Sequence, residues 1–139
     1  MHYIKEVGLS GFEDKYPHQL SGGMRQRTGL ARALTVNSDI LLMDEPFSAV
    51  DEQMRRKLQE DLLNLLKIES KTVIFVTHSI EEAVYLADQV VILSGRPGSI
   101  ADIVYPEIDR EGDIDSIRRQ PRYIELVDEI WGSLRSYVE

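Results

Sequence analysis

Residues 40–46 read Ile-Leu-Leu-Met-Asp-Glu-Pro, an apolar run that ends in two adjacent carboxylates. A continuous apolar run of this length is typical of a parallel strand with both faces covered. Ligands of open α/β sheets bind at the carboxyl edge of such strands. We therefore expect Asp44 to be placed to hold a hydrated Mg²⁺, and Glu45 to be placed to accept a proton from an attacking water. The alternative is a strand that simply ends in polar residues.

Two further apolar runs, 73–77 and 90–93, have the same character, and helical patterns separate the three runs. Apolar residues at three- and four-residue spacing predict a helix near 51–69. The sequence Ser-Ile-Glu-Glu at 79–82 is a capping-box pattern that opens a helix through about Ala87. This alternation predicts an α/β fold with a parallel sheet and right-handed crossovers.

The end of the chain is acidic, with five basic and ten acidic residues over 101–139. A Gly-Arg-Pro-Gly turn at 95–98 precedes it, and Ile100–Val104 is a candidate edge hairpin. A solvated acidic segment follows, and Pro121 suits the first turn of a last helix. The predicted apolar positions of that helix are Tyr123, Val127, Ile130, Trp131, Leu134 and Val138.

Length and composition restrict the class of protein. The 139 residues predict one domain, and 42% hydrophobic with 29% charged residues are typical of a globular chain. A net charge of −8 argues against a stand-alone nucleic-acid binder, and the absence of cysteine excludes disulfides and thiolate chemistry. No apolar run approaches the roughly 20 residues that cross a bilayer, and the first residues, MHYIKEVG, lack the apolar core of a signal peptide. We expect a soluble, cytosolic chain whose membrane role comes through a partner.

Residues 20–24 read Leu-Ser-Gly-Gly-Met and precede a helical pattern that runs from Met24 to about Val36. Ser21 is placed to cap that helix. Because Gly22 and Gly23 carry no side chain, a ligand could approach the backbone amides of the helix start closely, and the helix dipole and two following arginines add positive potential. The alternative is an ordinary capped helix after a loop.

Two more residues are candidates for chemistry. His78 follows the run 73–77 and is placed to donate to a phosphate oxygen at the same sheet edge, although a lone histidine is more often structural. Asp51 joins the acidic strand end to the next helix, where an N-terminal cap is its structural alternative. The other two histidines lack the spacing of a zinc site.

Four segments in this order resemble the ATP-binding subunits of ABC transporters over about residues 5–100. They are LSGGMRQRTGLARAL at 20–34, LLMDEP at 41–46, SAVD at 48–51 and VTHSIEEA at 76–83. The stretches 16–20 and 85–98 resemble the nitrate, sulfonate and taurine type of bacterial importer.

The resemblance implies the P-loop NTPase fold of ABC ATPases, with parallel strands and flanking helices, of which this chain is the C-terminal portion. Residues 1–100 would be the C-terminal part of the ATPase domain, and 101–139 an acidic segment and C-terminal helix of the same subunit.

The resemblance also implies residue roles. Ser21, Gly22 and Gly23 match the family signature, which contacts the γ-phosphate of ATP bound on the opposite subunit of a dimer. The signature departs from the commoner pattern in having Met24 where glutamine is usual.

Four acidic or basic positions match further family residues. Asp44 matches the Walker B carboxylate for Mg²⁺, and Glu45 matches the catalytic base. Asp51 matches the D-loop aspartate at the dimer interface, and His78 matches the switch histidine at the γ-phosphate.

The implied substrate is ATP and the implied cofactor is Mg²⁺. The implied partners are a second ATP-binding subunit in a homodimer, transmembrane permease subunits and, indirectly, a periplasmic solute-binding protein, with no nucleic acid. The implied location is the cytoplasmic face of the cell membrane.

One family motif is absent from the sequence. The phosphate-cradling loop G-x-x-x-x-G-K-[ST] does not occur, and none of the five lysines follows a glycine. Since phosphoryl transfer requires held phosphates, we expect the isolated chain neither to bind ATP tightly nor to hydrolyse it. We also expect an uncovered sheet edge and an uncovered apolar face.

Two alternatives stay open. The chain could be a non-catalytic partner that donates only its signature helix to another subunit. It could also be a piece of an ABC-type ATPase of DNA repair or chromosome maintenance, although it lacks sustained heptads and is acidic.

Overall fold

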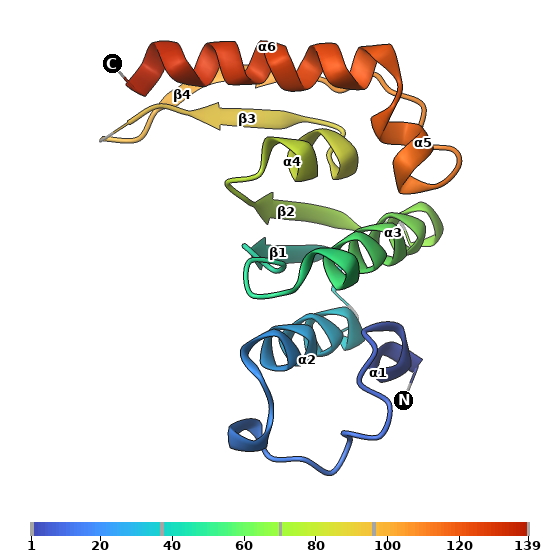
Figure 1. The fold of residues 1–139 in the computed structure, drawn as a ribbon. Helices are drawn as coiled ribbons and strands as arrows, with labels where there is room; N and C mark the ends of the chain where they lie inside the picture. Colours follow the sequence, from blue (N-terminus) through green and yellow to red (C-terminus); the bar gives the residue numbers. More distant parts are fainter. Residues whose placement is uncertain (1, 37, 70, 96, 139) are drawn as a thin grey trace. The chain divides into compact units, whose positions relative to one another are not determined.

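The computed structural model describes residues 2–36, 38–69, 71–95 and 97–138. It divides into two compact units, Met1–Val76 and Thr77–Glu139. The elements of the first unit are α1 (His2–Glu6), the 3-10 helix η1 (Pro17–Gln19), α2 (Gly22–Thr35), β1 (Ile40–Asp44), α3 (Glu52–Ile68) and β2 (Thr72–Val76) (Figure 1). The second unit contains α4 (Ile80–Leu86), β3 (Val90–Leu93), β4 (Ile100–Val104), α5 (Ile114–Arg118) and α6 (Pro121–Val138).

The predicted strands and main helices are confirmed, with ends that differ from the prediction by at most two residues. Three short elements, α1, η1 and α5, were not predicted. Each has five residues or fewer, which is too short for a hydrophobic period to be read from the sequence.

Strands β1 and β2 are parallel, with Leu42 opposite Ile74 and Asp44 opposite Val76. Their faces differ: Leu41 and Met43 are buried, whereas Leu42 is 70% exposed. The expectation that both faces of these strands are covered is therefore wrong for the described residues. Side chains alternate between the two faces of a strand, and only one face packs against a core. The expected uncovered apolar face is present, and it consists of Ile40, Leu42, Ile74 and Val76.

Strand β3 corrects a second expectation. We expected it in the parallel sheet, but it pairs antiparallel with β4, and the predicted hairpin is confirmed. The length of the connection explains why β3 and β4 run antiparallel to each other. Only residues 94–99 separate the strands, a parallel pair needs a crossover of about a dozen residues, and a hairpin does not. Ser94 and Ser99 close the turn, with a hydrogen bond from Ser94 N to Ser99 O of 2.8 Å.

The core of the first unit brings together α2, α3, the sheet and the loop after β1. Phe47, from this loop, is 1% exposed and its ring centroid lies 5.8 Å from that of Phe75 on β2. The other buried apolar residues are Val7, Leu9, Leu20, Leu30, Ala31, Leu34, Leu41, Met43, Val50, Leu58, Leu62 and Leu63. Burial of Phe47 and Val50 fixes the loop that follows the acidic strand end.

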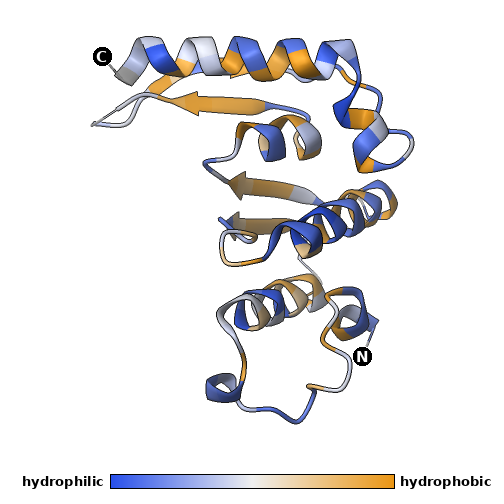
Figure 2. Cartoon of the chain, in the orientation of Figure 1, coloured by the Kyte–Doolittle hydropathy of each residue, from blue (hydrophilic) through white to orange (hydrophobic). Residues whose placement is uncertain are grey.

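In the second unit, α6 packs on α4 and α5. Apolar and polar residues alternate around α6 (Figure 2). Its buried positions are Tyr123, Leu126 and Ile130, so Leu126 was missed by the sequence analysis, and Trp131 is 48% exposed. The Tyr123 hydroxyl donates to Glu81 O at 2.9 Å, and burial raises the pKa of Tyr123 to about 12. None of the helices in the described part of the chain has the length and apolar character to cross a membrane.

Arg110 closes the carboxyl end of α4. Its guanidinium donates to Tyr85 O at 2.9 Å and to Ala87 O, and it pairs with Asp88 at 3.2 Å. The Arg110 side chain is 16% exposed, whereas the Asp88 side chain is fully exposed. The hydrogen bonds to the carbonyls therefore contribute more to stability than the ion pair, because water screens the charge of the exposed Asp88.

Arg110→Met should lower the free energy of unfolding of the second unit by about 2 kcal/mol, because carbonyls at the end of α4 would lose charged donors. The measurement is urea unfolding followed by the fluorescence of Trp131, the single tryptophan. Arg135→Met, at an exposed position near the end of α6, is the control. Equal losses in both variants would contradict the assigned role of Arg110.

The charged carboxylate of Asp61 on α3 destabilises the first unit. Its Oδ2 atom is buried without a hydrogen-bond partner. Burial raises the pKa of Asp61 above 3.8, the charge of Lys57 opposes the rise, and Glu6 and Glu60 add to it. A carboxyl whose pKa is raised by folding destabilises the folded state at pH values above that raised pKa, where it is charged.

Asp61→Asn should therefore raise the midpoint of thermal unfolding at pH 7. The gain should shrink as the pH falls through the raised pKa toward 3.8, because wild-type Asp61 then becomes neutral as well. The measurement is thermal unfolding by circular dichroism across this pH range. Asp14→Asn, at an exposed loop position, is the control. A gain that stays constant with pH would contradict the electrostatic explanation.

Candidate functional site

The start of α2 has the predicted cap. Ser21 is extended (φ −64°, ψ 167°), and its Oγ accepts a hydrogen bond from Met24 N at 3.2 Å. The two glycines that follow are alike in sequence but differ in surroundings. A Cβ at Gly22 would have no neighbour within 4 Å, whereas a Cβ at Gly23 would lie 2.8 Å from Ala49 O. Gly22 therefore leaves open space at the helix start, and Gly23 permits close packing on the loop after β1.

Asp44 ends β1 and is exposed, and Glu45 follows in the left-handed region with φ 44°. Glu45 is the non-glycine residue with a positive φ among those described. Such a conformation costs about 1–2 kcal/mol and persists where the surroundings enforce it. Here Glu45 N donates to Val76 O at 2.8 Å, and Gln26 Nε2 donates to Glu45 O at 2.7 Å.

Gln26, on α2, was missed by the sequence analysis. It occurs three residues after Gly23, so the two residues share a helix face. That spacing is a local signal, but only the folded chain shows that this face meets the loop after β1.

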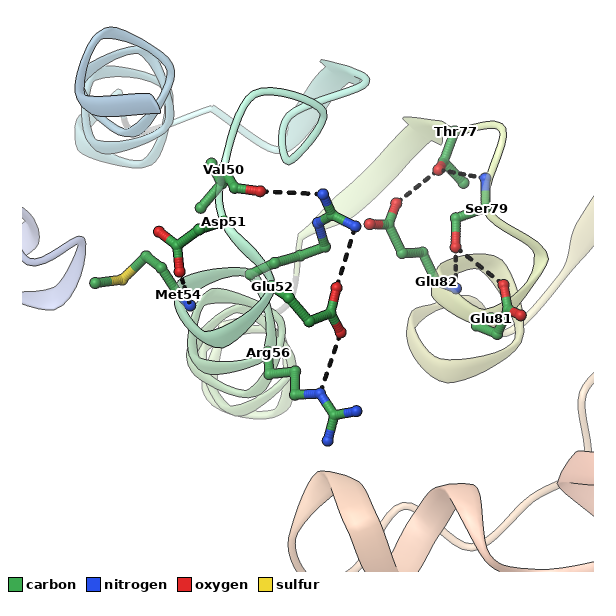
Figure 3. Close-up of polar contacts among 10 residues, drawn as sticks. Val50, Asp51, Glu52, Met54, Arg56, Thr77, Ser79, Glu81 and Glu82 are labelled. Atoms are coloured by element: carbon green, nitrogen blue, oxygen red, sulfur yellow. Dashed lines mark hydrogen bonds and ion pairs between the residues drawn. The ribbon is translucent and has the colours of Figure 1, made fainter. Parts of the chain in front are cut away.

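Asp51 has the structural role that we considered as its alternative. Its Oδ1 accepts a hydrogen bond from Met54 N at 3.1 Å and caps α3 (Figure 3). Arg55 donates to Val50 O at 3.0 Å and pairs with Glu52 at 3.3 Å, which secures the same turn. A role of Asp51 at a dimer interface stays a prediction.

His78 belongs to the second unit, in the loop before α4. The residues on either side of it are ordered by hydrogen bonds: Ser79 N donates to Thr77 Oγ1 at 3.0 Å, and Thr77 Oγ1 donates to Glu82 Oε2 at 2.6 Å (Figure 3). The Ser79 hydroxyl accepts from Glu82 N at 3.3 Å, which confirms the half of the predicted capping box in which Ser79 is the acceptor. His78 is an exposed residue.

The first unit thus brings together the glycine-opened start of α2, the acidic end of β1 and the loop that leads to Asp51. The described residues contain no group of three or more metal-ligating side chains. A lone exposed carboxylate such as Asp44 suits Mg²⁺, which keeps several waters and binds one or two carboxylates together with substrate phosphates.

Comparison with known proteins agrees with this geometry. The family described as ABC transporter matches residues 1–48. An uncharacterised ABC transporter ATP-binding protein of Methanocaldococcus jannaschii is 52% identical over 137 residues, which cover 96% of this chain and 51% of the relative. The taurine import ATP-binding protein TauB of Rhizobium johnstonii is 46% identical over 140 residues, covering 98% and 53%. This chain is a homologue of ABC transporter ATP-binding proteins.

Solved structures show that this ABC homologue has the corresponding fold. A dimeric ATP-binding cassette bound to ADP and Pi superposes with a TM-score of 0.69 at 33% identity, covering 76% of this chain and 45% of that one. The expected fold class, part of an ABC-type P-loop NTPase, is confirmed. The ABC homologue spans about half the length of the curated relatives it matches.

The surroundings of Gly22 and Gly23 predict different effects of the same substitution. Gly23→Ala should lower the free energy of unfolding by about 1–3 kcal/mol, since the added methyl would press on a backbone carbonyl. Gly22→Ala should be neutral or stabilising by up to about 1 kcal/mol, because alanine favours the helix. Urea unfolding followed by circular dichroism measures both, and equal effects would contradict the assigned packing.

Proposed function

We propose that this chain supplies the signature, the acidic strand end and the switch histidine of an ATP-hydrolysing subunit of an ABC importer of the nitrate, sulfonate and taurine type. The observation that carries the proposal is Glu45, held in a left-handed conformation at the carboxyl end of β1 beside the signature helix. The import class rests on relatives named for taurine, nitrate and aliphatic sulfonate import.

In this proposal the acidic strand end works on ATP bound to the same subunit. Asp44 would hold Mg²⁺, which when bound neutralises the charge that develops on the phosphates. The Glu45 carboxylate accepts a proton from the water that attacks the γ-phosphate. The His78 ring donates to a γ-phosphate oxygen and stabilises the developing charge.

The signature helix works on ATP bound to the other subunit of a homodimer. Ser21, Gly22 and Gly23 present backbone amides and the positive end of the α2 dipole, both of which suit phosphate. The open space at Gly22 supports this assignment. Asp51 lies at the interface, and closure of the dimer drives a transmembrane permease, to which a periplasmic solute-binding protein delivers the solute.

The same proposal covers domain organisation and location. Residues 1–100 form the C-terminal part of the ATPase domain, and 101–139 form the acidic segment and C-terminal helix of the same subunit. The subunit lies at the cytoplasmic face of the membrane through its permease. The uncovered apolar face of β1 and β2 is where a nucleotide-binding half of the cassette packs, because parallel strands are stable when both faces are covered.

The chain alone, without the phosphate loop, should show neither tight ATP binding nor ATP hydrolysis above a buffer control. In a complete subunit that carries these residues, Glu45→Gln should lower kcat by about 10²–10⁴-fold and leave nucleotide binding in place. Phosphate release and nucleotide titration are the measurements. ATP turnover by the chain alone that disappears in Glu45→Gln would overturn the prediction of an inactive chain.

A second candidate function has one observation in its favour. The glycine-opened start of α2 is formed without any phosphate loop, so the chain could act as a non-catalytic donor of its signature. Mixing the chain with a full subunit that lacks its own signature tests this. Restored ATP hydrolysis would favour the donor function over the catalytic one.

A further inference from the structure

The side-chain amide of Gln26 makes three hydrogen bonds to the loop after β1. Its Nε2 donates to Glu45 O at 2.7 Å and to Ser48 Oγ at 3.0 Å, and its Oε1 accepts from Ala49 N at 2.7 Å. Both N–H donors and the oxygen of this amide are used by groups within five consecutive residues. Such complete use of one side chain restricts the loop more than any single bond would.

The loop also has apolar anchors. Phe47 and Val50 are 1% and 5% exposed, so their side chains fix the loop against the core. Between these anchors, Ser48 and Ala49 are exposed and their polar groups turn toward Gln26. The apolar anchors determine where the loop lies, and the Gln26 bonds determine how its peptide groups are oriented.

The first turn of α2 makes a second contact with the same peptide. The Ala49 carbonyl oxygen lies 2.8 Å from where a Cβ of Gly23 would be, and the Ala49 amide bonds to Gln26 one turn further along α2. Both polar groups of Ala49 therefore face α2. A shift of α2 along its axis would break the Gln26 bonds or bring the Gly23 backbone into collision with the carbonyl.

Both backbone polar groups of Glu45, its amide and its carbonyl, make hydrogen bonds. Val76 O accepts from its amide, and its carbonyl accepts from Gln26 Nε2 and from Ser48 N at 3.2 Å. The Gln26 bond is the one that comes from outside the sheet and the loop. It stabilises the carbonyl orientation that a positive φ at Glu45 requires.

We propose that Gln26 is a positioning residue that holds the backbone of Glu45 in its left-handed conformation and couples the start of the signature helix to the acidic strand end. Its catalytic consequence rests on the proposed function, whereas the positioning itself does not. If Glu45 is the base for one ATP and Ser21 to Gly23 contact another, Gln26 links the two sites of the dimer through a single side chain.

Two variants of the whole 139-residue chain separate the atoms of Gln26. Gln26→Met keeps the size and removes all three bonds, whereas Gln26→Glu keeps the acceptor for Ala49 N and removes both donors. Amide hydrogen exchange by NMR should be about tenfold faster at Ala49 in Gln26→Met and close to wild type in Gln26→Glu. The amide resonances of Glu45 and of Phe47, the residue after Pro46, should shift in both variants.

Gln53→Met, at an exposed position of α3, is the control and should change neither readout. A general loss of stability would speed exchange throughout the first unit, so the difference between Gln26→Met and Gln26→Glu at one amide is specific to positioning. Unchanged exchange at Ala49 and unchanged resonances around Glu45 in Gln26→Met would overturn the proposal.

In a complete subunit, Gln26→Met should lower kcat by about tenfold with KM unchanged. The substitution would displace the proposed base, Glu45, and leave nucleotide binding unaffected. If Glu45→Gln leaves hydrolysis intact, the proposed function fails and the exchange result stands. If Glu45→Gln abolishes hydrolysis but Gln26→Met leaves kcat unchanged, the positioning role fails by itself.

Discussion

The backbone of Glu45 is the constraint on which the site depends. The parallel pairing of β1 with β2 continues one residue past Asp44, where Glu45 N donates to Val76 O. The chain leaves the sheet directly after this bond, since β1 ends at Asp44. A positive φ at Glu45 achieves that turn, and it is stable because the surrounding hydrogen bonds offset its conformational cost.

Helix α2 packs closely on the loop that follows this turn, because Gly23 has no side chain. At Gly23 the backbone of α2 lies closer to the loop after β1 than a side chain at this position would allow. This proximity brings Gln26 within reach of Glu45. The proposed base and the proposed phosphate-binding amides are thus joined by direct contacts within the first unit. In an ATPase that works as a dimer, such contacts would make hydrolysis at one site sensitive to the occupancy of the other.

Local signals predicted much of this site. Ser21, Asp51 and Ser79 were each predicted at a helix start, and each accepts the expected amide three residues later. Caps depend on neighbours within one turn, so the sequence contains all the information needed. The contact between Gln26 and Glu45 spans nineteen residues and a strand, and no pattern in either segment indicates it.

The sequence by itself determined where the strands lie, where the capped helices begin, and which residue types end β1, because these features depend on short-range periodicity and chain stiffness. The tertiary structure alone decided which face of β1 and β2 stays exposed, that β3 lies outside the parallel pair, and that Gly22 and Gly23 have different surroundings. Pairing and burial are set by residues that are distant along the chain, and their effect is absent until those residues meet.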